Sequence, residues 1–346
     1  MRIIIHIDLD YFYAQAEERE DPSISGKPVV VCVYSGRSEN SGAVATANYV
    51  ARGFGVNSGM SIILAEKKLS GKDPVFLPVN LKLYNKVSAN IMNISRAFAD
   101  KFEQVSIDEA FIDVTDMLSK DYSELEYAQK VKNAIVAKER LTSSIGVGPN
   151  KLIAKMVSSI KKPDGLTIVK PDDVNSFLNP LPVSKLYGIG KKTAKRLNEL
   201  GIKTIEDLAR FDVNKLTDVF GKKLGLYFHS AANGIDNEPV RERETAESYS
   251  RINTLKEDTR DFENIILVLD QLTDDIKVKI VKHNLNVATV GIIAFMENLI
   301  VHSKSKTIEA PTDDMNAIKV NIRKLLEELL KENPNLNIRR VGIKVS

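Results

Sequence analysis

Apolar and polar residues alternate at the start of the chain and predict a β-strand that ends in acid. Every second residue from Ile3 to Leu9 is apolar, and the residues between them end in Asp8 and Asp10. A period of two places these two sets of side chains on opposite faces of a sheet. The next segment, YFYAQAEE, contains helix formers and two glutamates. Asp10 could therefore lie at or near the N-cap of a helix and act as a cap, or be a second acid beside Asp8.

A second apolar segment, VSIDEAFIDV at 105–114, also favours a strand, yet it carries Asp108 next to Glu109. Neighbouring strand residues point to opposite faces, so one carboxylate should face a core unless the chain bends. A buried carboxylate needs a cation, a metal or a proton. No Lys or Arg lies between Gln104 and Thr115. The partner must come from elsewhere in the chain or be a bound metal.

Two strands that each end in unpaired acids can converge on one point. Three carboxylates there, from Asp8, Asp108 and Glu109, would repel one another unless a divalent metal neutralised them. Oxygen-only ligands suit Mg²⁺, and two such ions can activate an attacking oxygen and stabilise a leaving one in phosphoryl transfer. The spacing predicts a metal site for phosphoryl chemistry.

The second half of the chain contains two further patterns. Gly188, Ile189 and Gly190 lie between helical segments and predict a helix-hairpin-helix, in which backbone amides approach a phosphate; a simple capped helical hairpin is the alternative. A weaker, partial repeat of this glycine and lysine pattern begins at Phe220. After a polar segment at 234–244, the periodicity changes in the order strand, helix, two strands, helix, strand.

Composition narrows the class of protein. A length of 346 residues with 43% hydrophobic content suggests roughly two to four globular domains. The absence of a run of 18 apolar residues predicts a soluble protein, and the single Cys32 excludes an internal disulfide and fits a reducing cytosol. The four histidines lack the spacing of a zinc site. A net charge of only +3 means that any nucleic-acid interface must be a local patch.

Five stretches in order along the chain resemble the Y-family DNA polymerases, most closely the archaeal DNA polymerase IV branch: DLDYFYAQAEE, GKPVVVCVYSGR, SGAVATANYVAR, SIDEAFIDV and KKPDG. The resemblance implies an α+β fold shaped like a right hand. Its expected parts are a ferredoxin-like palm with fingers at 1–168 (fingers about 12–80), a helical thumb at 169–236, a linker at 237–246 and a βαββαβ little finger at 247–346.

The resemblance also implies site residues. The catalytic, metal-binding carboxylates are those of Asp8, Asp108 and Glu109, with the backbone carbonyl of Leu9, where many relatives have Phe. Tyr13 matches the steric gate against a ribose 2′-hydroxyl; ordinary helix packing is the alternative. The residues expected to contact the incoming nucleotide are Tyr11, Phe12, Tyr13, Thr46, Tyr49, Arg52 and Lys162. Arg52 and Lys162 suit its triphosphate, because arginine and lysine bind phosphate. The turn signature after Lys162 predicts that it lies on a loop.

Small residues in the expected fingers would leave room around a templating base, at Val33, Gly42, Ala43 and Ala45. A packed helix that requires alanines is the alternative for this stretch. The DNA contacts expected from the resemblance are Gly188, Gly190, Lys191, Lys192, Arg251, Arg339 and Arg340. Lys344 and the basic residues of HSKSK, 302–306, are further candidates for contacts with phosphate.

The expected activity is template-directed DNA synthesis of the translesion type, with low fidelity, two Mg²⁺ ions and no exonuclease for proofreading. Primer-template DNA and deoxynucleoside triphosphates are the expected partners, for a monomer in the cytoplasm. No clamp-binding peptide follows VGIKVS, which leaves a sliding clamp in doubt. Two alternatives stay open: a nucleotidyl cyclase with a related palm, which has no use for a helix-hairpin-helix, and a non-catalytic DNA-binding protein, which has no use for three acids.

Overall fold

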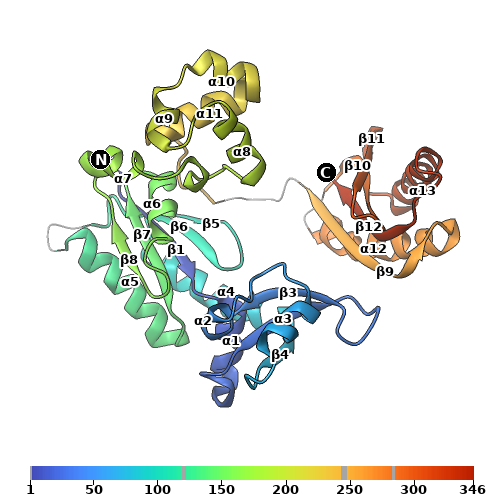
Figure 1. The fold of residues 1–346 in the computed structure, drawn as a ribbon, viewed down its shortest axis with the longest axis horizontal. Helices are drawn as coiled ribbons and strands as arrows, with labels where there is room; N and C mark the ends of the chain where they lie inside the picture. The colour runs from blue at the N-terminus through green and yellow to red at the C-terminus, as the bar shows by residue number, and fades with distance from the viewer. Residues whose placement is uncertain (1, 119–121, 243–247, 283–284) are drawn as a thin grey trace. The chain divides into compact units, whose positions relative to one another are not determined.

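The computed structural model describes residues 2–118, 122–242, 248–282 and 285–346 (Figure 1). The chain forms two compact units. The first consists of residues 1–32, 44–58 and 66–243, and the second of residues 33–43, 59–65 and 244–346. In the described ranges, no helix has both the length and the apolar character needed to cross a membrane.

A five-stranded sheet, called the palm sheet below, lies at the centre of the first unit. Its order is β5-β6-β1-β7-β8, and β1 pairs antiparallel with both β6 and β7. The strands are β1 (Ile4–Leu9), β5 (Lys101–Gln104), β6 (Glu109–Asp113), β7 (Ser143–Gly148) and β8 (Leu166–Ile168). The first strand of the sequence is therefore the central strand of the sheet.

The two faces of β1 follow the predicted period of two. Ile5, Ile7 and Leu9 belong to a core shared with α4 (Leu81–Arg96) and α5 (Glu124–Glu139). Ile4 belongs to a second cluster with Ala154 of α6 (Lys151–Ser158), on the other face. His6 and Asp8 alternate with the first set and so share the face of Ile4. The sheet thus lies between two helical layers (Figure 1).

Asp10 lies directly before the N-cap of the first helix, as expected, but the expectation that its side chain caps that helix is wrong. The N-cap of α1 (Phe12–Glu20) is Tyr11, and it makes no side-chain capping bond. Tyr11 has a φ of 36°, so the chain turns sharply between strand and helix. The carboxylate of Asp10 is buried elsewhere, at 1% exposure.

The strand expected over 105–114 is shorter than predicted, because the chain bends at 106–108. The backbone N–H groups of Val105 and Ser106 both donate to the carbonyl of Glu109, at 3.0 and 3.3 Å. β6 begins only at Glu109. Asp108 therefore lies in the bend, and the strict alternation of faces does not apply to this pair of acids.

The expected fingers contain a small sheet of order β3-β2-β4. Its strands are β2 (Val29–Tyr34), β3 (Gly42–Ala47) and β4 (Val75–Pro78), and its helices are α2 (Tyr49–Gly53) and α3 (Ile62–Leu69). The alanine-rich stretch 42–47 is thus a strand, and the alternative of a packed helix is wrong there. Short side chains suit this strand, because a Cβ at Gly42 would lie 2.2 Å from the carbonyl oxygen of Val33.

The expected thumb is helical. Its α-helices are α7 (Val174–Leu178), α8 (Lys191–Glu199), α9 (Ile205–Arg210), α10 (Val213–Phe220) and α11 (Lys222–Ala232). Short 3₁₀ turns at Pro171–Asp173 and Val183–Lys185 precede α7 and α8, and a third, Pro22–Ile24, follows α1. These helices share one core with Leu152, Met156 and Val157 of α6. α6 therefore packs on the palm sheet with one side and on the thumb helices with the other.

Residues 248–346, called the little finger below, have the predicted βαββαβ order. The elements are β9 (Tyr249–Thr259), α12 (Phe262–Lys282), β10 (Val287–Met296), β11 (Val301–Thr312), α13 (Met315–Glu332) and β12 (Ile338–Val345). The sheet order is β11-β10-β12-β9, and β10 and β11 form the expected hairpin. Of the expected linker, residues 237–242 contain no helix or strand, and 243–246 lie outside the described residues.

Candidate active site

Asp8 and Glu109 lie directly opposite each other on neighbouring strands of the palm sheet. The first comes from the end of β1 and the second from the start of β6. Each carboxylate is held by a lysine: Lys162 Nζ lies 2.5 Å from Asp8 Oδ1, and Lys155 Nζ lies 2.5 Å from Glu109 Oε2. The cations that the sequence required therefore come from distant parts of the chain.

Asp108 is close by but has a different environment. Its Oδ1 accepts a hydrogen bond from Ser106 Oγ at 2.6 Å, and its carbonyl accepts one from the N–H of Leu9 at 3.0 Å. Among the described residues, no three acidic, histidine or cysteine side chains gather closely enough to hold a metal ion. The structure thus brings Asp8 and Glu109 together and leaves Asp108 beside them in the bend.

Burial and charge act in opposite directions on these acids. Burial raises the pKa of Asp8, against the lowering effect of Lys162. The imidazole of His6 and the ammonium of Lys155 lower the pKa of Glu109 to about 2. Lys155 is the stronger neighbour, because His6 Nε2 lies 3.9 Å from Glu109 Oε2, which is beyond hydrogen-bonding range. Burial lowers the pKa of His6, which favours the neutral imidazole.

Sequence reasoning missed Lys155 and His6. His6 is fully buried; its Nδ1 lies 2.9 Å from Ser158 Oγ, and its Nε2 has no hydrogen-bond partner within the described part of the chain. Lys155 was detectable, because Lys151 and Lys155 are four residues apart on a helix that is otherwise apolar. That spacing places both lysines on one face, where Lys151 pairs with Glu103 at 2.8 Å.

Three of the expected nucleotide-binding residues form one aromatic and basic group. The rings of Tyr11 and Tyr49 meet edge to face at 5.4 Å, and the guanidinium of Arg52 lies 4.9 Å from the Tyr49 ring. Arg52 Nε also donates to the carbonyl of Ala47 at 2.8 Å. An open pocket of about 300 Å³ adjoins the two tyrosines and is lined also by Asp164. Lys162 lies on a loop, as predicted.

The remaining expected nucleotide-binding residues are on β3 and α1. Thr46 is half-buried on β3. Phe12 is 3% exposed and packs in the palm core, so its side chain is closed to a ligand. Tyr13 stacks on Tyr84 with ring centres 4.2 Å apart and planes 10° from parallel. Burial and the charge of Asp108 raise the pKa of Tyr13.

The residues expected around a templating base are open to solvent in part. Val33 is 56% exposed at the end of β2, and Ala43 is exposed on β3. Gly42 lies against the backbone of Val33, and Ala45 is half-buried. Gly42, Ala43 and Ala45 leave little side-chain bulk on β3.

The hairpin before α8 combines a glycine of positive φ with an open helix N-terminus. Gly188 has a φ of 88°, and a Cβ there would lie 2.9 Å from the Tyr227 ring. Ile189 is buried and anchors the turn, whereas Gly190 is the N-cap of α8 and has open space around it. Lys191 and Lys192 follow and are exposed. The backbone amides at the start of α8 are therefore accessible and flanked by positive charge.

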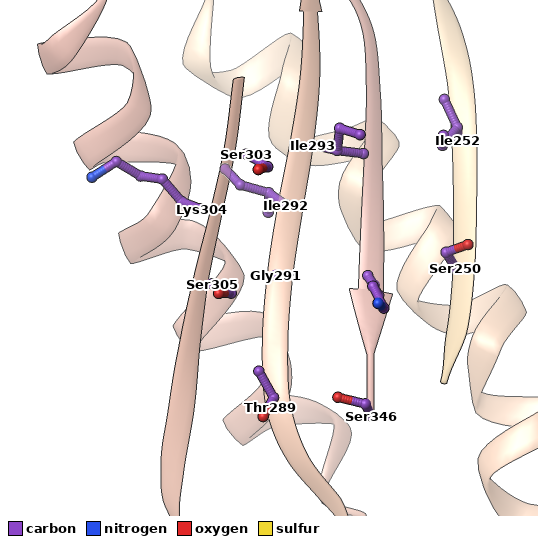
Figure 2. Close-up of a pocket in the computed structure, with 11 residues that line it drawn as sticks. Ser250, Ile252, Thr289, Gly291, Ile292, Ile293, Ser303, Lys304, Ser305 and Ser346 are labelled. Atoms are coloured by element: carbon purple, nitrogen blue, oxygen red, sulfur yellow. The ribbon is translucent and has the colours of Figure 1, made fainter. Parts of the chain in front are cut away.

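The little-finger sheet has one face covered by helices and one open face. On the open face, β10, β11 and β12 place Gly291 beside Ser305 and Lys344. A shallow pocket of about 420 Å³ lies there. Figure 2 shows hydroxyl side chains on all four strands or just beyond them, from Ser250, Thr289, Ser303 and Ser346.

The strand register separates the basic residues expected to contact DNA. Arg340 lies opposite Thr254 and Lys344 opposite Ser250, on the open face. Arg251 lies opposite Ile343, whose side chain is buried in the core with the helices. Residues opposite each other in an antiparallel pair share a face, so Arg251 is on the helix side of an edge strand.

Two other basic residues are already engaged by acids. Arg339 lies 3.6 Å from Asp258. Lys304 of the HSKSK stretch pairs with Glu328 and Glu332 of α13, at 3.1 and 2.6 Å. Sequence reasoning missed Ser303 and Ser305, whose hydroxyls alternate with the lysines of this stretch and line the open face.

Comparison with known proteins covers nearly the whole chain. The impB/mucB/samB family matches residues 7–159, its C-terminal domain matches residues 246–346, and the thumb domain of DNA polymerase-iota matches residues 184–236. The chain is 47% identical to DNA polymerase IV of Methanosarcina acetivorans, over 99% of this chain and 95% of that protein. It is 44% identical to DNA polymerase IV of Nitrosopumilus maritimus, over 100% and 95%.

Solved structures give the same result. The Y-family DNA polymerase chimera Dbh-Dpo4(243-245)-Dbh superposes with a TM-score of 0.93 at 39% identity, covering 99% of this chain and 98% of that one. The insertion ternary complex of Dbh DNA polymerase gives 0.70 at 38% identity, with the same coverage. The expected α+β fold, with a helix-hairpin-helix thumb domain and a C-terminal little-finger domain, is confirmed. The chain belongs to the Y-family DNA polymerases, in the DNA polymerase IV group.

Proposed function

We propose that this protein extends a primer 3′ end along a DNA template, opposite damaged as well as undamaged bases, with low fidelity and without proofreading. The observation that supports it most is the pair of acids Asp8 and Glu109, opposite each other on the central strands and each neutralised by a lysine. Such a pair marks a place that demands positive charge. A non-catalytic DNA-binding protein has no use for these acids, and a nucleotidyl cyclase has no use for a hairpin suited to the DNA backbone.

The donor chemistry of the acids fits a divalent metal, because carboxylates are hard oxygen donors. Asp8 and Glu109 each pair with a lysine ammonium that a metal would replace, and Asp108, whose carboxylate is held by Ser106, would have to turn toward them. We propose that Asp8, Asp108 and Glu109, with the carbonyl of Leu9, hold two Mg²⁺ ions when DNA and nucleotide are bound. Bound metal would supply charge neutralisation for the attacking primer hydroxyl and the leaving pyrophosphate. The acids orient that charge, and the palm sheet holds Asp8 and Glu109 in place.

The other residues bind and select the nucleotide. Arg52 and Lys162 are suited to the triphosphate, with Tyr11, Tyr49 and Thr46 beside them. Lys162 now contacts Asp8, and a metal on Asp8 would release its ammonium to the phosphates. Tyr13 would exclude a ribose hydroxyl. Phe12 takes part only through its backbone, because its side chain is buried.

The DNA would be held by two surfaces. The hairpin at Gly188 and Gly190 with Lys191 and Lys192 is suited to the backbone of one strand, and the open little-finger face with Arg340 and Lys344 to the duplex. Contacts of this kind track phosphates and carry no base sequence. Residues Val33, Gly42, Ala43 and Ala45 leave room for an altered templating base.

The remaining expectations stay predictions. They are the boundaries 1–168, 169–236, 237–246 and 247–346, a monomeric state, a cytoplasmic location and the open question of a sliding clamp.

The test is primer extension on an undamaged and an abasic template with Mg²⁺. We expect Asp108→Asn and Glu109→Gln to lower turnover on the order of a thousandfold, because an amide cannot supply the charge that a metal needs. Asp113→Asn, on the same strand as Glu109 but at its other end, is the matched control and should extend normally. Near-normal synthesis by either active-site variant, with primer-template binding intact, would contradict the proposal.

A further inference from the structure

Asp10 is a buried carboxylate that the proposed chemistry does not use. It is 1% exposed, and its oxygens accept three hydrogen bonds: from Ser144 Oγ at 2.7 Å, Thr142 Oγ1 at 2.9 Å and the backbone N–H of Asp164 at 2.8 Å. No lysine or arginine forms an ion pair with it in the described ranges of the chain. Three donors meet the cost of burying this charge.

The backbone of Asp164 is also held from the other side. Lys132 of α5 is 6% exposed, and its Nζ donates to the carbonyl of Asp164 at 2.5 Å, to Oδ1 of the same residue at 2.6 Å and to the carbonyl of Ser143 at 3.0 Å. Asp164 itself has a φ of 57°, a left-handed conformation that needs support. Hydrogen bonds thus hold the turn 162–165 on two sides, from Asp10 just after β1 and from Lys132 in the middle of α5.

This turn carries Lys162, two residues before Asp164. The Lys162 ammonium reaches Asp8 Oδ1 at 2.5 Å. A long lysine side chain is flexible, so its reach into the site depends on where its backbone is fixed. The fixed points are the Asp10 and Lys132 contacts to the turn.

We infer that Asp10, assisted by Lys132, is a positioning residue that holds the turn 162–165 so that Lys162 meets the triphosphate of the incoming nucleotide. The inference rests on the proposed role of Lys162 and extends it to two buried residues that touch neither nucleotide nor metal. Asp10 acts through hydrogen bonds, and its charge is not required at the site.

The donors around Asp10 allow its hydrogen bonds to be tested separately from its charge. An asparagine at position 10 can still accept from Asp164 and Thr142 with its oxygen, and its amide can donate to Ser144, whose hydroxyl accepts as well as donates. An alanine leaves the Asp164 N–H without its acceptor. A positioning role therefore predicts that Asp10→Ala is defective and that Asp10→Asn restores function.

The experiment measures apparent KM and kcat for single-nucleotide insertion on primer-template DNA, with Tm as a check of folding. We expect Asp10→Ala to raise the KM for deoxynucleotide about tenfold or more, with a smaller change in kcat. Asp10→Asn should stay within about threefold of wild type. A KM for Asp10→Asn as high as that of Asp10→Ala would overturn the inference, since the charge itself would then be needed.

A double-mutant cycle with Lys162→Ala separates this inference from the proposed function. If Asp10 acts through Lys162, adding Asp10→Ala to Lys162→Ala changes KM no further. Additive effects, or a normal KM for Asp10→Ala beside a raised KM for Lys162→Ala, would overturn the inference alone. An unchanged KM for Lys162→Ala would remove the proposed role of Lys162 and the inference with it.

A matched control and a second variant cover loss of folding. Asp113 is also nearly buried, and its Oδ1 accepts from the N–H and hydroxyl of Thr115, so Asp113→Ala should lower Tm without raising KM. If Asp10→Ala does not fold, Lys132→Met loosens the same turn from the other side. A folded Lys132→Met with an unchanged KM would then refute the inference.

Discussion

At Asp8 and Glu109, two partly buried acids are neutralised by lysines that are 154 and 46 residues away in the sequence. The local sequence showed that each acid needed a positive partner. It did not show which of the 49 lysines and arginines would supply it. Ion pairs of this kind are decided by the packing of α6 and of the turn 162–165 onto the palm sheet.

The lowered pKa of Glu109 makes stability depend on pH through Lys155. An acid whose folded pKa is about 2, against an unfolded value of 4.5, stabilises the fold above about pH 4.5 and loses that contribution as pH falls toward 2. Lys155→Met should therefore lower the free energy of unfolding by about 1 kcal/mol at pH 7, after allowance for solvent screening. Denaturant titrations at pH 7 and pH 3 should show the deficit shrinking by about half at pH 3.

Lys27→Met provides the comparison for that experiment. Lys27 pairs with Asp73 at 2.9 Å, and both side chains are well exposed, so its loss should be small at either pH. A deficit for Lys155→Met that does not change with pH would show that the lysine contributes by packing alone.

Tyr13 is supported in a way that suits a steric gate. Its ring stacks on Tyr84, a fully buried residue whose hydroxyl donates to Glu17 at 2.6 Å. A rigid ring blocks a 2′-hydroxyl better than a mobile one. Tyr13→Ala should raise ribonucleotide insertion relative to deoxynucleotide insertion by about tenfold or more, as measured by the ratio of kcat/KM. Tyr13→Phe should keep the discrimination, and equal selectivity for wild type and Tyr13→Ala would assign Tyr13 to packing.

At the level of elements, the hairpin before α8 can be predicted because one of the two reasons for a glycine at 188 is local. Gly188 needs a positive φ and also leaves room for Tyr227, whose hydroxyl donates to the carbonyl of Tyr187 at 2.8 Å. The first cause can be read from the sequence. The second depends on Tyr227 of α11, which lies 40 residues after Tyr187 in the sequence.

The two causes can be separated by a matched pair of substitutions. Gly188→Ala should cost about 1–3 kcal/mol in backbone strain, plus the clash with Tyr227, and should weaken primer-template binding. Gly201→Ala has a similar φ of 83° but no neighbour within 4 Å, so it should show strain alone and bind DNA normally. Thermal melts and a DNA titration measure the two effects. Equal loss of DNA binding in both variants would argue against the hairpin as a phosphate site.

The open face of the little finger shows how a strand pattern can mislead. The lysines of HSKSK predict contacts with phosphate, yet period-two alternation turns Lys304 to the helix side and Ser303 and Ser305 to the open face. The hydroxyls, together with Arg340 and Lys344, are the residues that face outward there.

At the level of the whole molecule, residues 248–346 enclose a core of their own, from Leu255 to Val345. Removing residues 247–346 should therefore leave the palm sheet folded but weaken DNA binding and shorten the products of primer extension. Gel analysis under single-encounter conditions measures product length, and Arg340→Gln with Lys344→Gln in the full chain tests the open face. Product lengths equal to those of the full chain would contradict the proposed role of the little finger.

The sequence alone determined the features that depend on neighbours in the chain: the period of two in β1, the βαββαβ order of residues 248–346 and the glycine hairpin before α8. Backbone preference and burial pattern act over a few residues, so they can be read locally. The tertiary structure alone decided the bend at 106–108, the partners of Asp8 and Glu109, and the place of Asp10 under the turn 162–165. Those outcomes depend on which distant groups the folded sheet and helices bring within hydrogen-bonding distance. A buried carboxylate must be paired or hydrogen-bonded, and only the tertiary packing determines which donors are near it.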